Sequence, residues 1–320
     1  MPRFSVILPL YNKEPYVLRT LESVARQTFR DFEAIVIDDG STDSSAEVVE
    51  RFLDGHPDSG MFRLVLQEDR GVSATRNRGV SIATGEYVTF LDCDDWWEPG
   101  FLEEIDRLIR RYPEAGIYGT GYYLVKNGRR RVAPVGVDEA FVDGIIDYCD
   151  VYAKTLCMPL TSDTVALRRD LFEASGGFRT DITLGEDFDF WLRIALKHPV
   201  AYLNRPLANY FQDLPSNSRA IGQKEYNPDT FMTFHFDRYA EEESVNPRLK
   251  VLLDKLRVYT LLYFRRKNLY PDRVQQEISK VDFSNVQPIY RFYYKAPYPL
   301  VRCYWGIMQT LSSIKHRILR

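Results

Sequence analysis

The chain has 320 residues, of which 45% are hydrophobic, 27% charged and 14% aromatic, a composition typical of globular proteins. This length is enough for one large or two smaller domains, and no apolar run is long enough for a membrane-spanning helix. The first residues lack a signal-peptide layout, because the initial apolar stretch breaks at Pro9, and the four cysteines show no C-x-x-C spacing. We therefore expect a cytoplasmic protein with reduced thiols and neither a zinc site nor a disulfide framework.

The first half of the chain alternates short apolar runs with helical patterns. Strands are predicted at residues 4–8, 33–37, 62–66 and 87–91, and helices at 14–27, 43–53, 72–83 and 99–112. This alternation favours an α/β fold with a mostly parallel, Rossmann-like sheet covered by helices on both faces. Further along, strands are predicted at 116–125 and 161–168, and helices at 186–197, 247–266 and 300–319.

Charge is unevenly distributed along the chain. The net formal charge is −3, but residues 248–320 carry 15 Lys/Arg and 4 Asp/Glu, a net charge of +11, which leaves −14 on residues 1–247. An acidic body with a basic C-terminal region suggests two roles in one chain. We place the domain boundary in a stretch rich in Pro, Asn, Ser and Gly at 213–229, which gives a domain at 1–215 and a mainly helical, basic region at 216–320.

Acidic residues follow two of the predicted strands. Asp38 and Asp39, taken alone, are most simply the cap of the next helix, whereas Asp92, Asp94 and Asp95 repel one another after an apolar strand that offers no compensating charge. A divalent cation would neutralise them, and oxygen ligands select Mg²⁺ or Mn²⁺. Such a cation usually keeps substrate phosphates as ligands, and the sequence has neither a P-loop nor a G-x-G-x-x-G loop. These residues therefore predict a metal-bridged diphosphate site.

Four segments carry a resemblance to a known family: SVILPLYNKEPYV, IVIDDGSTD, GVSATRNRGVSIATGEYVTFLDCDD and GEDFDFWLR. In this order and spacing they resemble the inverting glycosyltransferases of family 2, which have the GT-A fold. The resemblance implies transfer of a sugar from a nucleotide-diphosphate donor, with a UDP-sugar favoured, to an acceptor hydroxyl, with Mn²⁺ or Mg²⁺ as the cofactor. The Q-x-x-R-W signature of processive members is absent, so we expect non-processive transfer, in the biosynthesis of cell-surface polysaccharide or lipopolysaccharide.

The resemblance also implies roles for residues that bind the donor. Pro9 and Tyr11 would shape the nucleotide pocket, with Tyr11 packed on the base. Asp39 would accept the N–H of a uracil-like ring, a hydrogen bond to a charged group worth about 1.5–3 kcal/mol. Asp92 would hold the ribose. Arg76 would lie near the nucleotide, where a guanidinium suits phosphate or a ring face, and the alternative for Arg76 is a surface ion pair.

The metal would be held by Asp94 together with Asp92, with Asp95 in support. Many relatives have a histidine in a later Y-R-x-H stretch, but here that stretch reads Tyr210-Phe211-Gln212-Asp213. The third protein ligand is therefore open, and Asp213 is only a candidate.

Glu186 and Asp187 match the family's late acidic pair, in which the Asp is the general base. The base would take the acceptor's proton as the acceptor oxygen attacks the anomeric carbon. At the start of a helix, both carboxylates lie near the positive end of the helix dipole, which favours the ionised base. The alternative is an ordinary pair of first-turn carboxylates. Asp189 should face elsewhere, and Trp191 is expected in the core rather than in an acceptor pocket.

The region 291–320 has six Lys/Arg and no acidic residue. On a helical wheel, residues 300–319 have a broad apolar stripe opposite several basic residues, which favours peripheral contact with an anionic membrane. Packing against the catalytic domain is the alternative. The resemblance favours the membrane, because many relatives act on lipid-linked acceptors at the inner face of bacterial membranes.

Two other functions remain as rivals. A sugar-phosphate nucleotidyltransferase also uses metal-binding aspartates on an α/β domain, but it needs a Gly-rich N-terminal loop that this chain lacks. A catalytically silent, membrane-associated scaffold is the other, and the presence of the acidic motifs speaks against it. We expect a glycan or lipid-linked glycan as the acceptor and no nucleic-acid partner.

Overall fold

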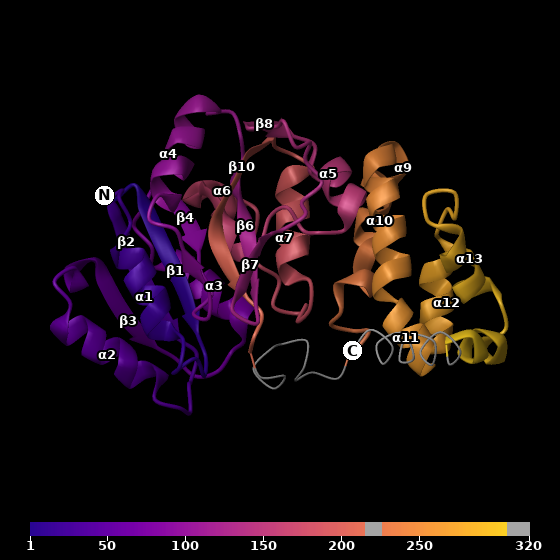
Figure 1. The fold of residues 1–320 in the computed structure, drawn as a ribbon, viewed down its shortest axis with the longest axis horizontal. Coiled ribbons are helices and arrows are strands. Elements are labelled where there is room, and N and C mark those ends of the chain that lie inside the picture. Colours follow the sequence, from indigo (N-terminus) through magenta and orange to yellow (C-terminus); the bar gives the residue numbers. More distant parts are fainter. Residues whose placement is uncertain (215–225, 306–320) are drawn as a thin grey trace. The chain divides into compact units, whose positions relative to one another are not determined.

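A computed structural model describes residues 1–214 and 226–305 (Figure 1). The chain divides into two compact units, Met1–Met232 and Thr233–Arg320. The predicted boundary between residues 215 and 216 lies outside the described residues, as do residues 306–320 of the predicted C-terminal helix.

The first unit is built on a ten-stranded sheet with flanking helices. Its strands are β1 (Phe4–Leu10), β2 (Phe32–Asp38), β3 (Phe62–Leu66), β4 (Tyr87–Phe90), β5 (Trp96–Trp97), β6 (Ile117–Lys126), β7 (Arg129–Val132), β8 (Asp143–Ile146), β9 (Val165–Arg168) and β10 (Val200–Phe211). Its helices are α1 (Val17–Ala25), α2 (Ser45–Gly55), α3 (Val72–Ser81), α4 (Phe101–Arg111), α5 (Tyr148–Thr155), α6 (Arg169–Ala174) and α7 (Glu186–Ala195), with short 3₁₀ turns η1 (Ser59–Met61) and η2 (Ser162–Thr164).

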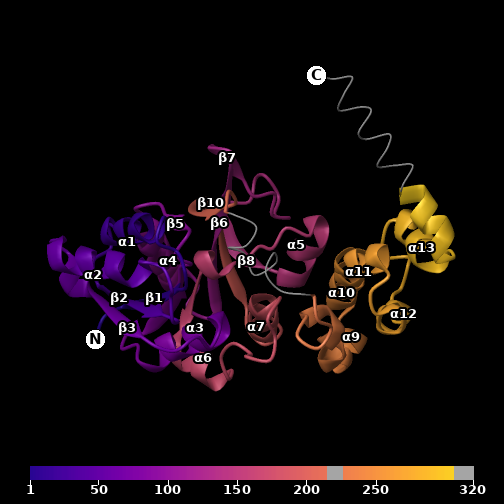
Figure 2. The same cartoon turned by 90° about the horizontal axis from the view of Figure 1, so that it is seen from below.

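The N-terminal part of the sheet is entirely parallel, in the order β3-β2-β1-β4. Strand β1 is apolar on both faces because helices cover both sides (Figure 2). Val6 and Leu8 belong to the core that includes α1, α2 and α4, whereas Ile7 meets α3 on the other face. Gly79 allows this close approach, since a Cβ at that position would overlap the Ile7 side chain. The predicted α/β architecture is confirmed.

The second half of the sheet is mixed. Strand β9 lies between β4 and β6 and runs antiparallel to both, while β6 and β10 pair in parallel. Strand β10 has irregular register at Leu203–Pro206 and Pro206–Ala208, and its far end pairs with β5. The predicted parallel arrangement therefore holds for the first four strands, and β9, antiparallel to both of its neighbours, departs from it.

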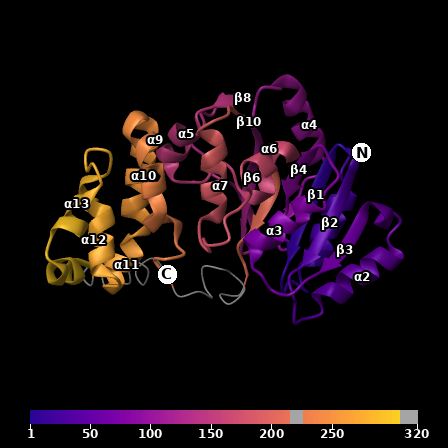
Figure 3. The same cartoon turned by 180° about the vertical axis from the view of Figure 1, so that it is seen from behind.

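The second unit is helical, as predicted for the C-terminal region (Figure 3). Its elements are η4 (Met232–Tyr239), α9 (Ala240–Val245), α10 (Pro247–Thr260), α11 (Leu262–Lys267), α12 (Pro271–Ser279) and α13 (Pro288–Lys295). The single helix predicted at 247–266 is interrupted at Leu261. Near this point the Thr260 hydroxyl donates to the carbonyl of Leu256 at 2.7 Å, a back-bond that bends helices.

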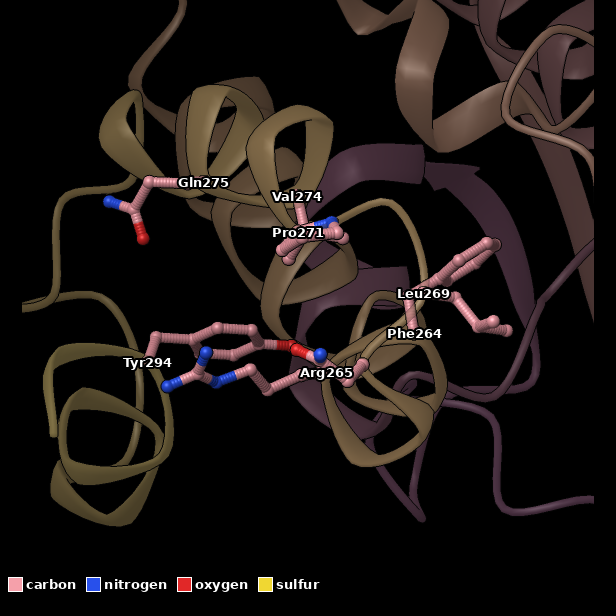
Figure 4. Close-up of a pocket in the computed structure, with 8 residues that line it drawn as sticks. Phe264, Arg265, Leu269, Pro271, Val274, Gln275 and Tyr294 are labelled. Carbon is pink, nitrogen blue, oxygen red and sulfur yellow. The ribbon is translucent and has the colours of Figure 1, made fainter. Parts of the chain in front are cut away.

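The interior of the second unit contains a buried ion pair and a small hollow. The Arg257 guanidinium donates to both carboxylate oxygens of Glu243, at 2.7 and 3.0 Å. Between α11, α12 and α13 there is a hollow with room for about one water molecule (Figure 4). The Tyr294 hydroxyl at this hollow already donates to the carbonyl of Val258 at 2.8 Å.

Residues 298–305 are helical and include 300–305, the described start of the helix predicted at 300–319. Val301 is fully buried and Trp305 nearly so, whereas Arg302 is exposed. In this short part, the apolar stripe therefore packs within the unit. Among the residues that the structure describes, no helix combines the length and the hydropathy that crossing a bilayer requires.

Candidate active site

The site lies at the carboxyl edge of the parallel strands, where the segments after β1, β2 and β4 come together. Leu10 at the end of β1 pairs with Asp38 at the end of β2. Asn12, in the left-handed region at φ 51°, accepts the amide of Thr42 at 2.8 Å through its side-chain oxygen. This bond ties the loop after β1 to the loop after β2. Tyr11, between Leu10 and Asn12, is 40% exposed.

Asp39 is buried and already accepts three hydrogen bonds. The Gln67 side-chain amide donates at 2.6 Å, and the backbone amides of Arg70 and Gly71 each donate at 2.9 Å. A carboxylate has about four acceptor positions, so one remains for a ligand. The aspartate predicted to bind the nucleobase is therefore also the residue that shapes the loop before α3.

Three carboxylates lie close together beyond the carboxyl end of β4. Oxygen atoms of Asp92, Asp95 and Asp163 lie within 4.8 Å of one another. Asp163 is a residue that the sequence analysis missed; it lies in η2, and its carboxylate accepts the backbone amide of Asp92 at 2.8 Å. Burial, followed by the charge of Asp92, raises the pKa of Asp163 to about 8.

The residues of this acidic cluster (Asp92, Asp95 and Asp163) fit a divalent cation. Asp95 accepts the Phe211 amide at 2.6 Å through Oδ1, while its buried Oδ2 has no hydrogen-bond partner in the described part of the chain. Burial and the charge of Asp163 raise the pKa of Asp95 well above its usual range. The Asp92 side chain is 34% exposed, so the cluster is open on one side. An all-oxygen set of three close carboxylates, of which Asp92 pairs with Arg76, suits Mg²⁺ or Mn²⁺.

Asp94, the predicted metal ligand, has a protein cation beside it. The Lys13 ammonium lies 2.7 Å from Asp94 Oδ2, and the Arg19 guanidinium donates to the main-chain oxygen of Asp94 at 2.7 Å. Burial raises the pKa of Asp94, and Lys13 opposes that rise. Asp213, the other candidate ligand, accepts the backbone amide of Asn127 at 2.6 Å.

Arg76 contacts both the acidic cluster and the first turn of α7. Arg76 is 3% exposed, and its guanidinium donates to Asp92 Oδ1 at 2.7 Å and lies 3.6 Å from Glu186 Oε1. The face of the Phe178 ring lies 5.3 Å away. Arg76 is therefore neither in a surface ion pair nor fully open to a nucleotide. It is a buried cation between the acidic cluster and the start of α7.

Glu186 and Asp187 occupy the first turn of α7, as predicted. Gly185 begins this helix with φ 86°, where a Cβ would lie 2.9 Å from the Met232 Cβ. Burial raises the pKa of both carboxyls, that of Glu186 to about 7, and the charge of Arg76 opposes both rises. A carboxyl with a raised pKa in a partly buried position is suited to accept a proton near neutral pH.

Two neighbours in α7 face the core, as expected. Asp189 is fully buried and pairs with Arg193 at 2.9 Å. Trp191 is also fully buried and packs against Phe90, Phe178 and Phe190. Both belong to the framework that holds the first turn of the helix.

A family profile described as "Glycosyl transferase family 2" matches residues 5–174. The chain is 40% identical over 235 residues to glycosyltransferase GlyA of Streptococcus pneumoniae, which covers 69% of this chain and 32% of GlyA. It is 31% identical over 225 residues to the amylovoran biosynthesis glycosyltransferase AmsB of Erwinia amylovora, which covers 65% of this chain and 69% of AmsB. The chain thus spans only about a third of the length of GlyA.

Solved structures share the fold. The S. aureus TarS 1-349 structure in complex with UDP-GlcNAc aligns with a TM-score of 0.71 and 19% identity, over 94% of this chain and 89% of that chain. The mannosyltransferase PcManGT of Pyrobaculum calidifontis, in complex with GDP-Man and Mn²⁺, aligns with a TM-score of 0.55 and 18% identity, over 96% and 87% of the two chains.

Proposed function

The chain belongs to glycosyl transferase family 2, and from that premise we propose that it transfers a sugar from a nucleotide-diphosphate donor to an acceptor hydroxyl. The transfer is inverting, metal-dependent and non-processive, and the favoured donor is a UDP-sugar. UDP-GlcNAc in TarS supports this donor class. The observation that carries the proposal is Arg76, whose guanidinium joins Asp92 of the acidic cluster to Glu186, one residue before the proposed base.

The nucleotide binds over the carboxyl edge of β1, β2 and β4. Pro9 and Tyr11 form its pocket, with the exposed Tyr11 ring against the base. Asp39 accepts the base N–H with its remaining acceptor position, and Asp92 holds the ribose. Three hydrogen bonds already fix the Asp39 carboxylate, so this side chain loses little further conformational entropy when the nucleotide binds.

Asp187 acts as the general base. Its carboxylate takes the proton of the acceptor hydroxyl while the acceptor oxygen forms a bond to the anomeric carbon. The bond from that carbon to the diphosphate oxygen breaks, and the nucleoside diphosphate leaves from the opposite face. Glu186 beside it, held by Arg76, keeps the first turn of α7 in place.

The metal would be Mn²⁺ or Mg²⁺, and Asp92 and Asp94 would hold it, with Asp95 and Asp163 as further oxygen donors. When bound, it stabilises the negative charge that develops on the leaving diphosphate. Mn²⁺ with GDP-Man in PcManGT supports a cation in this fold. The chain's own contribution is a set of oxygens held by backbone amides, those of Asp92 and Phe211.

The acceptor is a glycan or lipid-linked glycan of cell-surface polysaccharide or lipopolysaccharide, and AmsB, named for amylovoran biosynthesis, supports this class. We place the protein on the cytoplasmic side of the cell membrane, peripherally bound through residues 291–320. Phe292 and Leu300 are 38% and 59% exposed there, next to the exposed basic residues Arg291, Lys295 and Arg302. Exposed apolar groups with neighbouring basic charge favour an anionic bilayer surface.

A thermal-shift screen with a panel of nucleotide sugars and Mn²⁺ tests the donor class. A ligand that binds only the folded protein adds about 2.7 kcal/mol of stability at 100 times its Kd, so a true donor should stand out. Hydrolysis of that donor, followed by ¹H NMR, should then release the sugar first with the opposite anomeric configuration. Retention would contradict the single displacement. Release of pyrophosphate from a sugar phosphate and a nucleoside triphosphate would favour the nucleotidyltransferase, and no nucleotide binding at all would favour the scaffold.

A further inference from the structure

Lys13 supplies a cation to a carboxylate that is proposed to hold a metal. Its ammonium lies 2.7 Å from Asp94 Oδ2, and the two side chains are only 16% and 11% exposed. Charge pairs that are largely removed from water interact more strongly than surface pairs. Asp94 is thus compensated by Lys13, as Asp92 is by Arg76, whereas Asp95 of the neighbouring acidic cluster has a buried oxygen without a hydrogen-bond donor among the described residues.

The backbones on both sides of this ion pair are fixed. The Lys13 amide donates to the Ser45 hydroxyl at 2.8 Å, and the Lys13 carbonyl accepts the amide of Tyr16 at 2.9 Å. On the other side, Arg19 donates to the main-chain oxygen of Asp94 at 2.7 Å while its guanidinium lies 3.8 Å from the centre of the Trp96 ring. The part that can change partner is therefore the flexible side chain of Lys13, a compact point charge on a four-carbon stem.

We propose that Lys13 exchanges between two anions: it neutralises Asp94 before the donor binds and moves to the donor's diphosphate when a divalent cation takes Asp94. This inference rests on the proposed function. A cation at Asp94 adds two positive charges next to the ammonium, and their repulsion favours release of Lys13. The diphosphate arrives at the same place, because phosphate oxygens complete the coordination of such a cation. Lys13 is then a further residue that positions the leaving group.

The proposed exchange predicts that loss of the Lys13 charge changes the affinities for metal and for nucleotide in opposite directions. Lys13→Met keeps an unbranched side chain, one atom shorter, and removes its charge. At pH 8 this variant should bind MnCl₂ alone about tenfold tighter than wild type, because no ammonium competes for Asp94. In saturating MnCl₂ it should bind UDP about tenfold more weakly, because the diphosphate loses a cation. Calorimetry with MnCl₂ alone, and with UDP in the presence of MnCl₂, measures both constants without an acceptor or turnover.

The matched control is Lys154→Met, which removes the lysine of an exposed Lys–Asp pair with Asp150 at 3.1 Å. It should leave both constants unchanged. Lys13→Arg is a second variant that keeps the charge, so it covers the case in which Lys13→Met does not fold. Since a guanidinium can pair with Asp94 through two parallel bonds, Lys13→Arg should bind MnCl₂ alone more weakly than wild type.

Either of two results overturns the exchange: Lys13→Met binds MnCl₂ alone with wild-type affinity, or it binds UDP in MnCl₂ with wild-type affinity. If Lys13→Met does not fold, wild-type MnCl₂ affinity in Lys13→Arg has the same consequence. Failure of the proposed function looks different, because the wild-type protein would then bind neither MnCl₂ nor UDP at this site.

Discussion

Replacing Glu186 with Gln should make the stability of the first unit less sensitive to pH. The pKa of Glu186 is raised from an ordinary 4.5 to about 7, first by burial and then by the charge of Asp187. Between these two values the folded protein keeps a proton that the unfolded chain releases. The contribution of Glu186 to the free energy of unfolding is therefore present at low pH and lost as the pH rises through about 7. From pH 5.5 to 8.5 this loss amounts to about 2 kcal/mol.

Urea denaturation at the two pH values measures this effect, with tryptophan fluorescence as the signal, since three of the four tryptophans lie in the first unit. Relative to wild type, Glu186→Gln should gain about 2 kcal/mol in free energy of unfolding between pH 5.5 and 8.5. The control is Asp170→Asn. Asp170 is exposed and its pKa is lowered by Arg168, so its charge does not change in this range. If the difference in free energy of unfolding between Glu186→Gln and wild type is equal at both pH values, burial does not raise the pKa of Glu186.

Four further predictions address the site and the C-terminal region. Asp187→Asn should keep donor affinity and lower turnover at saturating donor by about 10²–10⁴-fold, whereas lost donor binding with intact turnover would assign Asp187 to the nucleotide pocket. Asp94→Ala should abolish metal-dependent UDP binding, measured by calorimetry, while its circular dichroism spectrum stays unchanged. Asp163→Asn should weaken Mn²⁺ binding about tenfold. Wild-type affinity in either variant would remove that residue from the set of metal ligands. The double variant Arg291→Glu/Lys295→Glu should lose sedimentation with anionic vesicles at low salt, because each basic residue near the surface contributes about 1 kcal/mol; wild-type protein that ignores such vesicles would contradict membrane contact.

The sequence was most informative where strands are buried on both faces. The runs at residues 4–8 and 33–37 are apolar apart from Ser5 and Glu33, which is why β1 and β2 could be predicted as buried strands. The placement of Glu186 and Asp187 at a helix start also followed from the local pattern.

The remaining features depend on contacts between distant segments. Asp163 is 71 residues from Asp92, so no local pattern links the two carboxylates that the fold brings together. Strand β10 contains Arg205 and Pro206, which break the strand pattern and coincide with its irregular register. The burial of Arg76 likewise arises from distant segments, since Arg76 lies in α3 and its partners Asp92 and Glu186 come from the loop after β4 and from α7.

The most direct test of the account is calorimetric titration of UDP into the wild-type protein, once with MnCl₂ and once with EDTA. We expect saturable binding of one UDP per chain with Mn²⁺ and loss of that binding in EDTA, because the acidic cluster and the diphosphate repel each other without a cation. Equal binding in EDTA would contradict metal dependence. No binding under either condition would contradict the nucleotide site itself.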